Sequence, residues 1–322
     1  MAHKKSFIVL GNYLRQRGNE AIEILDGYTL KKADSKQIKA IKKVFSKHSL
    51  GTDFLLISRE SKREIKQEKR RKGYSAYYYR LKDEELFNYW VIESNNNRMS
   101  DDVEFSLLLL KKHVWLLFEF DKNGVPIQKK YLLDIFITDY LGNDKDLRIT
   151  IENEDISDLK KNYENIKKLK ATGLWSILHN NLLQLLRDLD CISSVKLKGI
   201  AMVSVIESML VNQERSDKKI SQQFIEKLVI LNNELKKSGN EIKPPRNKDT
   251  KFSTLMGKLY KFRCDIAHAN WTNKNNSPDE YKELGGNFIE INEFIRLLLV
   301  SVISFAIEKP TFIEKLKYDN SI

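Results

Sequence analysis

Short segments rich in β-branched and aromatic residues recur along the first 150 residues, and such segments are typical of strands. They cover residues 7–10, 53–58, 113–120 and 131–141. The last two flank Lys122-Asn123-Gly124-Val125-Pro126, in which Asn-Gly is a strong signal for a tight turn. We therefore expect a hairpin at this point, in a part of the chain that contains a β-sheet.

Two polar stretches lie between these segments. Residues 35–47 place Ile38, Ile41 and Val44 on one face of a helix, and Ser35 is a suitable N-cap. Residues 59–72, RESKREIKQEKRRK, have almost no apolar face. They predict a solvated helix, laced by ion pairs, or a mobile loop rather than a core element.

After about residue 152 the strand signals fade and apolar residues recur with the helical period. Helices are expected near residues 155–170, 173–190, 194–212, 218–238, 252–269 and 288–308. Gly173 and Gly199 punctuate this series, and residues 239–250 and 272–286 have the composition of loops.

This change of pattern divides the 322-residue chain. We expect an α+β domain over residues 1–150, followed by an all-α helical bundle over residues 151–322. The boundary falls within residues 142–156. With 41% hydrophobic residues the chain has enough apolar material for a sizeable core.

The net charge of +12 is concentrated at one end of the chain. Residues 1–80 contain 20 Lys and Arg against 8 Asp and Glu, and the remaining sequence contains 36 of each. A local excess of this kind indicates a polyanionic partner, either nucleic acid or an acidic membrane surface. The alternative is a lysine-rich composition without functional meaning.

A compact basic cluster in this quarter stands next to tyrosines. The candidate nucleic-acid-binding residues are Lys69, Arg70, Arg71, Lys72, Tyr74 and Tyr77. Cationic side chains bind phosphates and aromatic rings stack on bases, as single-stranded RNA requires. The same tyrosines would also suit a half-buried strand.

Several chemistries lack their sequence signals. No apolar run approaches the ~20 residues of a membrane helix, and two cysteines make no disulfide framework. The five histidines have no metal-ligand spacing, and neither a P-loop nor a dinucleotide fingerprint nor a nucleophile elbow is present. We expect a cytoplasmic protein without metal or cofactor.

Arg263 and His268 are the one pair that suggests chemistry. RNA cleavage needs a group that moves protons near neutral pH, which His provides, and a cation for the phosphate, which Arg provides. In an ideal helix, positions five residues apart point about 140° away from each other. The helix must therefore end or distort between them, or a second subunit must complete the site.

Arg-x4-His resembles the signature of the HEPN superfamily (higher eukaryotes and prokaryotes nucleotide-binding domain). The surrounding sequence is closest to the ApeA-like branch. The matching positions are Leu259, Tyr260, Arg263, Ile266 and His268, with residues 200–210 similar to an upstream family helix and residues 220–224 similar to its Ile-Ser-x-x-Phe segment. The resemblance covers about residues 170–310.

This resemblance implies a HEPN-like bundle that dimerises, so that the two motifs meet across the interface. The implied activity is metal-independent endoribonuclease cleavage in a bacterial abortive-infection or toxin-type defence system. The substrate would be RNA, with tRNA as one candidate, and residues 1–150 would recognise substrate or sense a trigger. The family's small polar residue and glycine are replaced by Cys264 and Ala269. A catalytically inactive nucleic-acid-binding or dimerisation module is therefore the alternative.

Five further residues are candidates for supporting roles. Asp265 could hold the tautomer of His268 or be a solvated helix charge, and Glu207, in an apolar helix, should be exposed or paired with Arg263. Tyr260 suits packing, Asn270 suits substrate contact or a C-cap, and Cys264 could have a lowered thiol pKa beside Arg263.

Overall fold

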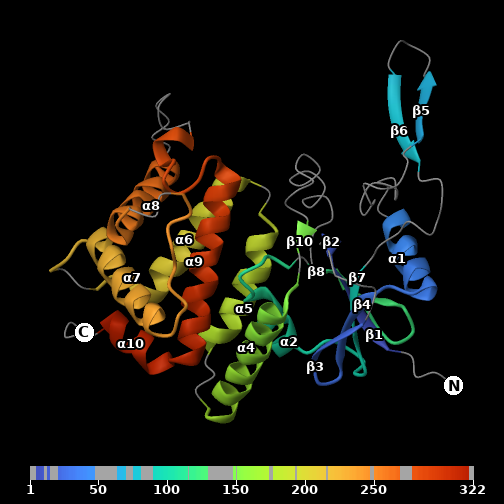
Figure 1. Cartoon of the computed structure of the whole chain (residues 1–322), viewed down its shortest axis with the longest axis horizontal. Coiled ribbons are helices and arrows are strands. Elements are labelled where there is room, and N and C mark those ends of the chain that lie inside the picture. Colours follow the sequence, from blue (N-terminus) through green and yellow to red (C-terminus); the bar gives the residue numbers. More distant parts are fainter. Residues whose placement is uncertain are drawn as a thin grey trace. The chain divides into compact units, whose positions relative to one another are not determined.

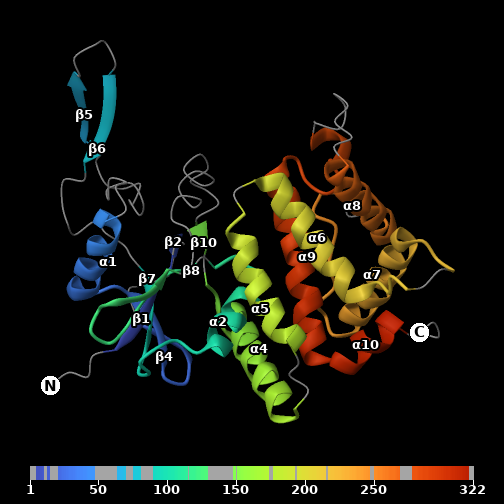
Figure 2. The same cartoon turned by 180° about the vertical axis from the view of Figure 1, so that it is seen from behind.

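The computed structural model divides into two compact units. The first consists of Met1–Leu107 and Lys112–Lys160, and the second of Leu108–Lys111 and Lys161–Ile322. The described residues are 5–10, 13–14, 21–47, 64–69, 75–80, 90–114, 116–129, 148–149, 151–173, 177–192, 194–214, 217–246, 250–268 and 278–318. A sheet lies in the N-terminal part and the C-terminal part is mostly helical (Figures 1 and 2). The expected order, α+β and then helical, is confirmed at this level.

The first unit is built around a six-stranded antiparallel sheet with the order β3-β4-β7-β1-β8-β9. The strands are β1 (Ser6–Leu10), β3 (Ile22–Leu25), β4 (Tyr28–Lys32), β7 (Trp90–Ser94), β8 (Leu116–Phe120) and β9 (Pro126–Lys129). Every residue of β7, β1 and β8 is buried, so the centre of the sheet is covered on both faces. Coverage on both faces explains why these strands are largely continuous apolar runs.

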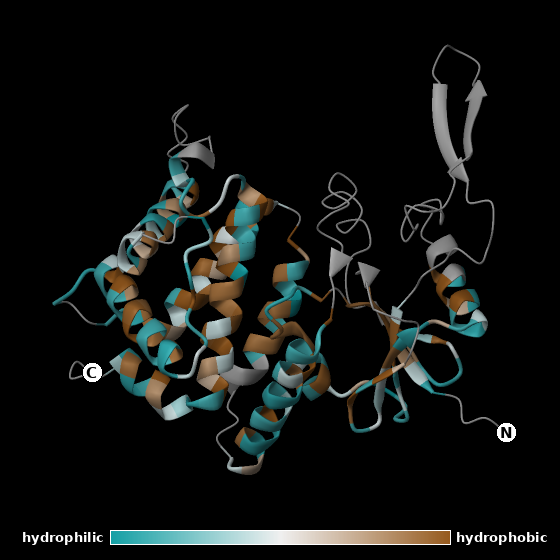
Figure 3. Cartoon of the chain, viewed as in Figure 1, coloured by the Kyte–Doolittle hydropathy of each residue, from teal (hydrophilic) through white to brown (hydrophobic). Residues whose placement is uncertain are grey.

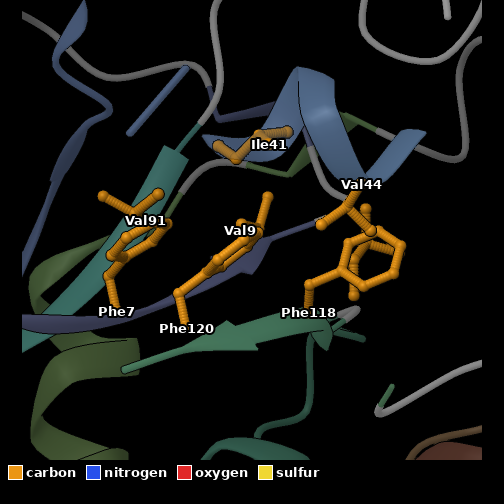
Figure 4. Close-up of a cluster of buried hydrophobic side chains, with 8 residues drawn as sticks. Phe7, Val9, Ile41, Val44, Val91, Phe118 and Phe120 are labelled. Atoms are coloured by element: carbon orange, nitrogen blue, oxygen red, sulfur yellow. The ribbon is translucent and has the colours of Figure 1, made fainter. Parts of the chain in front are cut away.

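Helix α1 (Ser35–Lys47) covers one face of this sheet, with the predicted bounds. Its Ile41 and Val44 pack into a cluster with side chains of β1 and β8 (Figure 4), where the rings of Phe7 and Phe120 stack with centroids 4.6 Å apart.

The predicted N-cap of α1 is wrong by one residue. The Asp34 carboxylate accepts hydrogen bonds from the backbone N–H groups of Lys36 and Gln37, both at 2.9 Å. The Gln37 side chain accepts one from the Asp34 N–H at 2.9 Å. This reciprocal pair is a capping box, and Ser35 is already inside the helix.

Two hairpins join neighbouring strands. Gly124 (φ 73°) turns the chain between β8 and β9, which confirms the predicted hairpin, although its second strand is β9 and residues 131–141 lie outside the described residues. Asp121 caps this turn by accepting the N–H groups of Asn123 and Val125. The β3–β4 hairpin was not predicted. Its Asp26-Gly27 turn, with Gly27 at φ 74°, is the local signal that marks it.

The expectation of a helix or loop over residues 59–72 is wrong for its centre. β5 (Glu64–Lys69) pairs antiparallel with β6 (Ser75–Arg80) in a separate two-stranded sheet. The charges of the first segment suit a helix, but the tyrosine-rich second segment favours strand and supplies a partner for it. A third sheet pairs β2 (Tyr13–Leu14) with β10 (Arg148–Ile149) in parallel. The predicted strand over residues 53–58 lies outside the described residues.

The six predicted helices of the second half are confirmed within a few residues. They are α4 (Asn153–Ala171), α5 (Ile177–Asp190), α6 (Val195–Leu210), α7 (Ile220–Lys237), α8 (Phe252–Ala267) and α9 (Phe288–Glu308). Helix α9 is rich in apolar residues (Figure 3), and many of them are buried. The short helix η2 (Pro278–Tyr281) and the helix α10 (Pro310–Tyr318) were not predicted. Within the described ranges, no helix combines the length and the apolar character needed to span a bilayer.

Gly173 follows α4 as expected, but Gly199 does not end a helix. It lies in the second turn of α6, where α8 and α9 approach closely. A Cβ atom at this position would stand 2.6 Å from Asn292 Oδ1 and 3.1 Å from the Phe262 ring. The glycine is required for close helix packing, a reason that its sequence neighbours do not reveal.

Candidate active site

Helix α8 carries both residues of the Arg-x4-His motif and is continuous between them. His268 is the C-cap, and its backbone N–H donates to the carbonyl of Cys264 at 3.0 Å and also to that of Ile266. The helix therefore ends at His268 and does not distort before it. Arg263 and His268 project about 140° apart around the axis, and no hydrogen bond joins them among the described residues.

Arg263 faces the buried carboxylate of Glu207 on α6. The Arg263 Nη2 atom lies 3.6 Å from Glu207 Oε1, and the side chains are 24% and 8% exposed. This is the pairing that burial of a charge in an apolar helix led us to expect. Glu207 Oε2 and Arg263 Nε are buried and have no hydrogen-bond partner in the described part of the chain.

Tyr260 lies beside this ion pair on α8. Its ring centroid is 5.9 Å from the guanidinium carbon of Arg263 and 5.4 Å from the ring centroid of Phe224 on α7. Burial first, and then the negative charge of Glu207, raises the pKa of the Tyr260 hydroxyl. Tyr260 thus packs α7 against α8 and presents its ring to the guanidinium.

The structure does not bring Asp265 and His268 together. The Tyr281 hydroxyl of η2 donates to Asp265 Oδ2 at 2.7 Å, and Lys261 Nζ lies 3.8 Å from the same atom. His268 is exposed, and in the described ranges its side chain has no partner. Asp265 is therefore not a solvated helix charge, and in the described ranges its carboxylate contacts Tyr281 and Lys261 and not His268.

Some of the other candidate residues lie within the described ranges and some lie outside them. Cys264 is a partly buried free thiol between Arg263 and Asp265. Lys69 ends β5 opposite Ser75, and Tyr77 of β6 is opposite Gln67. The predictions on Arg70, Arg71, Lys72, Tyr74 and Asn270 lie outside the described residues.

Sequence reasoning missed Tyr281, which is only 1% exposed, together with its neighbours Glu280 and Glu283. These residues lie in the range expected to be a loop. Pro278 at the first position of η2 is a local helix-start signal. Nothing local could pair Tyr281 with Asp265, because that contact depends on how η2 folds back onto α8.

Chemically, the end of α8 offers a permanently charged guanidinium and an accessible imidazole. Across the described ranges, no three His, Cys, Asp or Glu side chains gather into a group that could hold a metal ion. Comparison with protein-family models, with curated proteins and with solved structures gives no match for this chain.

Proposed function

We propose that this chain is a metal-independent endoribonuclease of a bacterial defence system that acts in the cytoplasm. Arg263 and His268 from both protomers of a homodimer would form the site, within a HEPN-like helical bundle. The observation that supports this most directly is the contrast between the two side chains on α8. Arg263 is held by a buried carboxylate, whereas His268 is exposed at the helix end.

The geometry of the motif supports the proposal of a second copy of the chain. Because α8 is continuous from Arg263 to its end, the two side chains diverge within one protomer. Two helix ends brought together by a two-fold axis would place each imidazole near the partner's guanidinium. The site is then incomplete in a monomer.

The proposed reaction transfers the phosphoryl group from the 5′-oxygen to the neighbouring 2′-oxygen. His268 accepts the proton of the attacking 2′-hydroxyl, the 2′-oxygen bonds to phosphorus, and the bond from phosphorus to the 5′-oxygen breaks. The second imidazole protonates the leaving 5′-oxygen, and Arg263 stabilises the extra negative charge on the phosphate. The products carry a 2′,3′-cyclic phosphate and a 5′-hydroxyl.

The test is cleavage of total RNA and of a tRNA pool in the presence of EDTA. Removing a general acid–base group costs about 10²–10⁴ in rate, so His268→Ala should lower kcat by that factor. Arg263→Ala should likewise bring cleavage down to background, because the cation that stabilises the phosphate charge is lost. Arg246→Ala is the matched control, because this arginine also pairs with a glutamate on a neighbouring helix, Glu290 at 2.7 Å, but lies outside the motif.

The outcomes separate the proposal from its rival. EDTA-resistant cleavage that disappears in both motif variants and persists in Arg246→Ala supports it. A well-folded dimer that binds RNA without cutting it, even with extract of infected cells as activator, indicates the non-catalytic binding module. Cleavage unchanged in His268→Ala overturns the assignment of the site.

A further inference from the structure

Helix α8 is clamped along one face by the segment that contains η2. Lys258, Lys261, Phe262 and Asp265 recur at helical spacing, so they lie on one face. Each contacts the segment 280–283, which follows them by about twenty residues. The clamp thus runs along two turns of α8 and ends one turn before His268.

The contacts of this clamp change in character along the helix. At the far end, Lys258 Nζ donates to Glu283 Oε1 at 2.5 Å, and Lys261 pairs with Glu280 nearby. In the middle, the Phe262 ring meets the Tyr281 ring edge to face, with centroids 5.2 Å apart.

At the end nearest His268, the Tyr281 hydroxyl donates to the Asp265 carboxylate at 2.7 Å. Asp265 is one turn from the cap, and Cys264, whose carbonyl accepts the His268 N–H at 3.0 Å, is its neighbour. A bond from outside the helix therefore holds the last turn just before the point where it would fray.

We infer that the Asp265–Tyr281 hydrogen bond fixes the last turn of α8 and so positions His268. The catalytic part of this inference rests on the proposed ribonuclease function. Tyr281 would be a positioning residue, because its hydroxyl is committed to Asp265 and no contact links it to His268 in the described part. A displacement of about 1 Å at a catalytic group can cost up to a hundredfold in rate, so a small anchor has a large kinetic effect.

The anchor is suited to persist over a wide pH range. Burial of the hydroxyl first, and then its hydrogen bond to Asp265, raises the pKa of Tyr281. Tyr281 therefore remains a hydrogen-bond donor at any pH at which an imidazole can exchange protons.

The first experiment measures backbone hydrogen exchange and needs no RNA. Tyr281→Phe keeps the ring and removes only the donor, and Asp265→Ala removes the acceptor. Both should speed exchange over residues 264–268 by about tenfold, the equivalent of one lost hydrogen bond of about 1.4 kcal/mol. Glu283→Gln is the matched control: it removes the charge from the Lys258–Glu283 contact of the same clamp, two turns away, and should leave exchange at 264–268 unchanged.

The second experiment measures RNA cleavage by the same variants. In Tyr281→Phe, kcat should fall about tenfold with little change in KM, because Arg263 still binds phosphate. Glu283→Gln should keep both constants. If KM rises and kcat falls in Tyr281→Phe and Glu283→Gln alike, the cause is general destabilisation, and the positioning role is overturned.

The two readouts keep this inference separate from the proposed function. Faster exchange confined to Tyr281→Phe and Asp265→Ala supports the anchor even if the wild-type protein cleaves no RNA. Missing cleavage by the wild type overturns only the proposed ribonuclease function. Unchanged exchange in these variants overturns the anchor whatever the activity. Faster exchange with an unchanged kcat overturns its catalytic role.

Discussion

Helix α8 is held by its neighbours in two different ways. Toward α6 it presents Arg263 to the buried carboxylate of Glu207 at 3.6 Å, longer than a hydrogen bond, and one polar atom of each side chain has no partner in the described part. Toward η2 it presents Asp265 to the Tyr281 hydroxyl at 2.7 Å, supported by ion pairs at the rim.

The difference indicates which side is built for stability and which retains chemical capacity. Most buried polar groups in proteins are hydrogen-bonded, because an orphan costs about 1–3 kcal/mol. On the η2 side the Asp265–Tyr281 bond obeys this rule, although Glu283 Oε2 at the rim has no partner in the described ranges. On the α6 side the Nε donor of Arg263 is buried without a partner in the same ranges. An arginine of this kind is suited to bind an anion that arrives from outside, as the proposed function requires.

The largest expected effect is on the α6 side. Arg263→Met strands the Glu207 charge and should lower the free energy of unfolding by about 2–3 kcal/mol, somewhat less than for a fully buried pair, since Arg263 is 24% exposed. The double variant Glu207→Met, Arg263→Met should lie within about 1 kcal/mol of wild type, because both charges are gone. Urea unfolding measures both values. Additive losses in the double variant would mean that the two charges are not coupled and would contradict their pairing.

An intermediate effect is expected on the η2 side, and it depends on pH. The pKa of Tyr281 is raised in the folded protein, so the stabilisation is complete below its unfolded pKa near 10 and is lost as pH rises toward the higher folded value. The wild type should exceed Tyr281→Phe by about 1 kcal/mol at pH 8. Most of this margin should vanish by about pH 11. A margin independent of pH would mean that the hydroxyl makes no bond to Asp265.

The smallest effect belongs to the rim of the clamp. Glu283→Gln should cost about 0.5 kcal/mol, because its partner Lys258 is 36% exposed and such pairs are screened. The hydrogen bond from Lys258 lowers the pKa of Glu283, so this contribution is present above the usual Glu pKa and disappears as pH falls through the lowered value. It should also shrink in 1 M salt. A loss above about 1 kcal/mol would place the rim on a level with the Asp265–Tyr281 bond.

Much of the fold could be predicted where the signal is local. The helical period located α4 to α9, and Asn123-Gly124 located the β8–β9 turn. Some failures have non-local causes: β5 is a strand because β6 pairs with it, and the need for glycine at position 199 comes from Phe262 and Asn292, which pack on it. The missed β3–β4 hairpin and the Asp34 cap, in contrast, had local signals.

The candidate site shows the same division. Glu207 could be expected in advance to be exposed or paired with Arg263, because a charge in an apolar helix needs water or a counter-charge. Asp265 could not be assigned, since its partner Tyr281 lies in a range without a helical period. Its position three residues before His268 suggested a contact, but in the structure its carboxylate accepts a hydrogen bond from Tyr281.

The sequence alone determined the succession of helices α4 to α9, the position of the β8–β9 turn and the presence of a cation and an imidazole at one helix end. These depend on backbone conformation and residue type, which act over a few residues. Only the tertiary structure decided that the ion pair of Arg263 is loose, that Asp265 belongs to Tyr281 and that His268 is exposed. Those facts depend on distances between α6, α8 and η2, which are set by packing among side chains far apart in the chain.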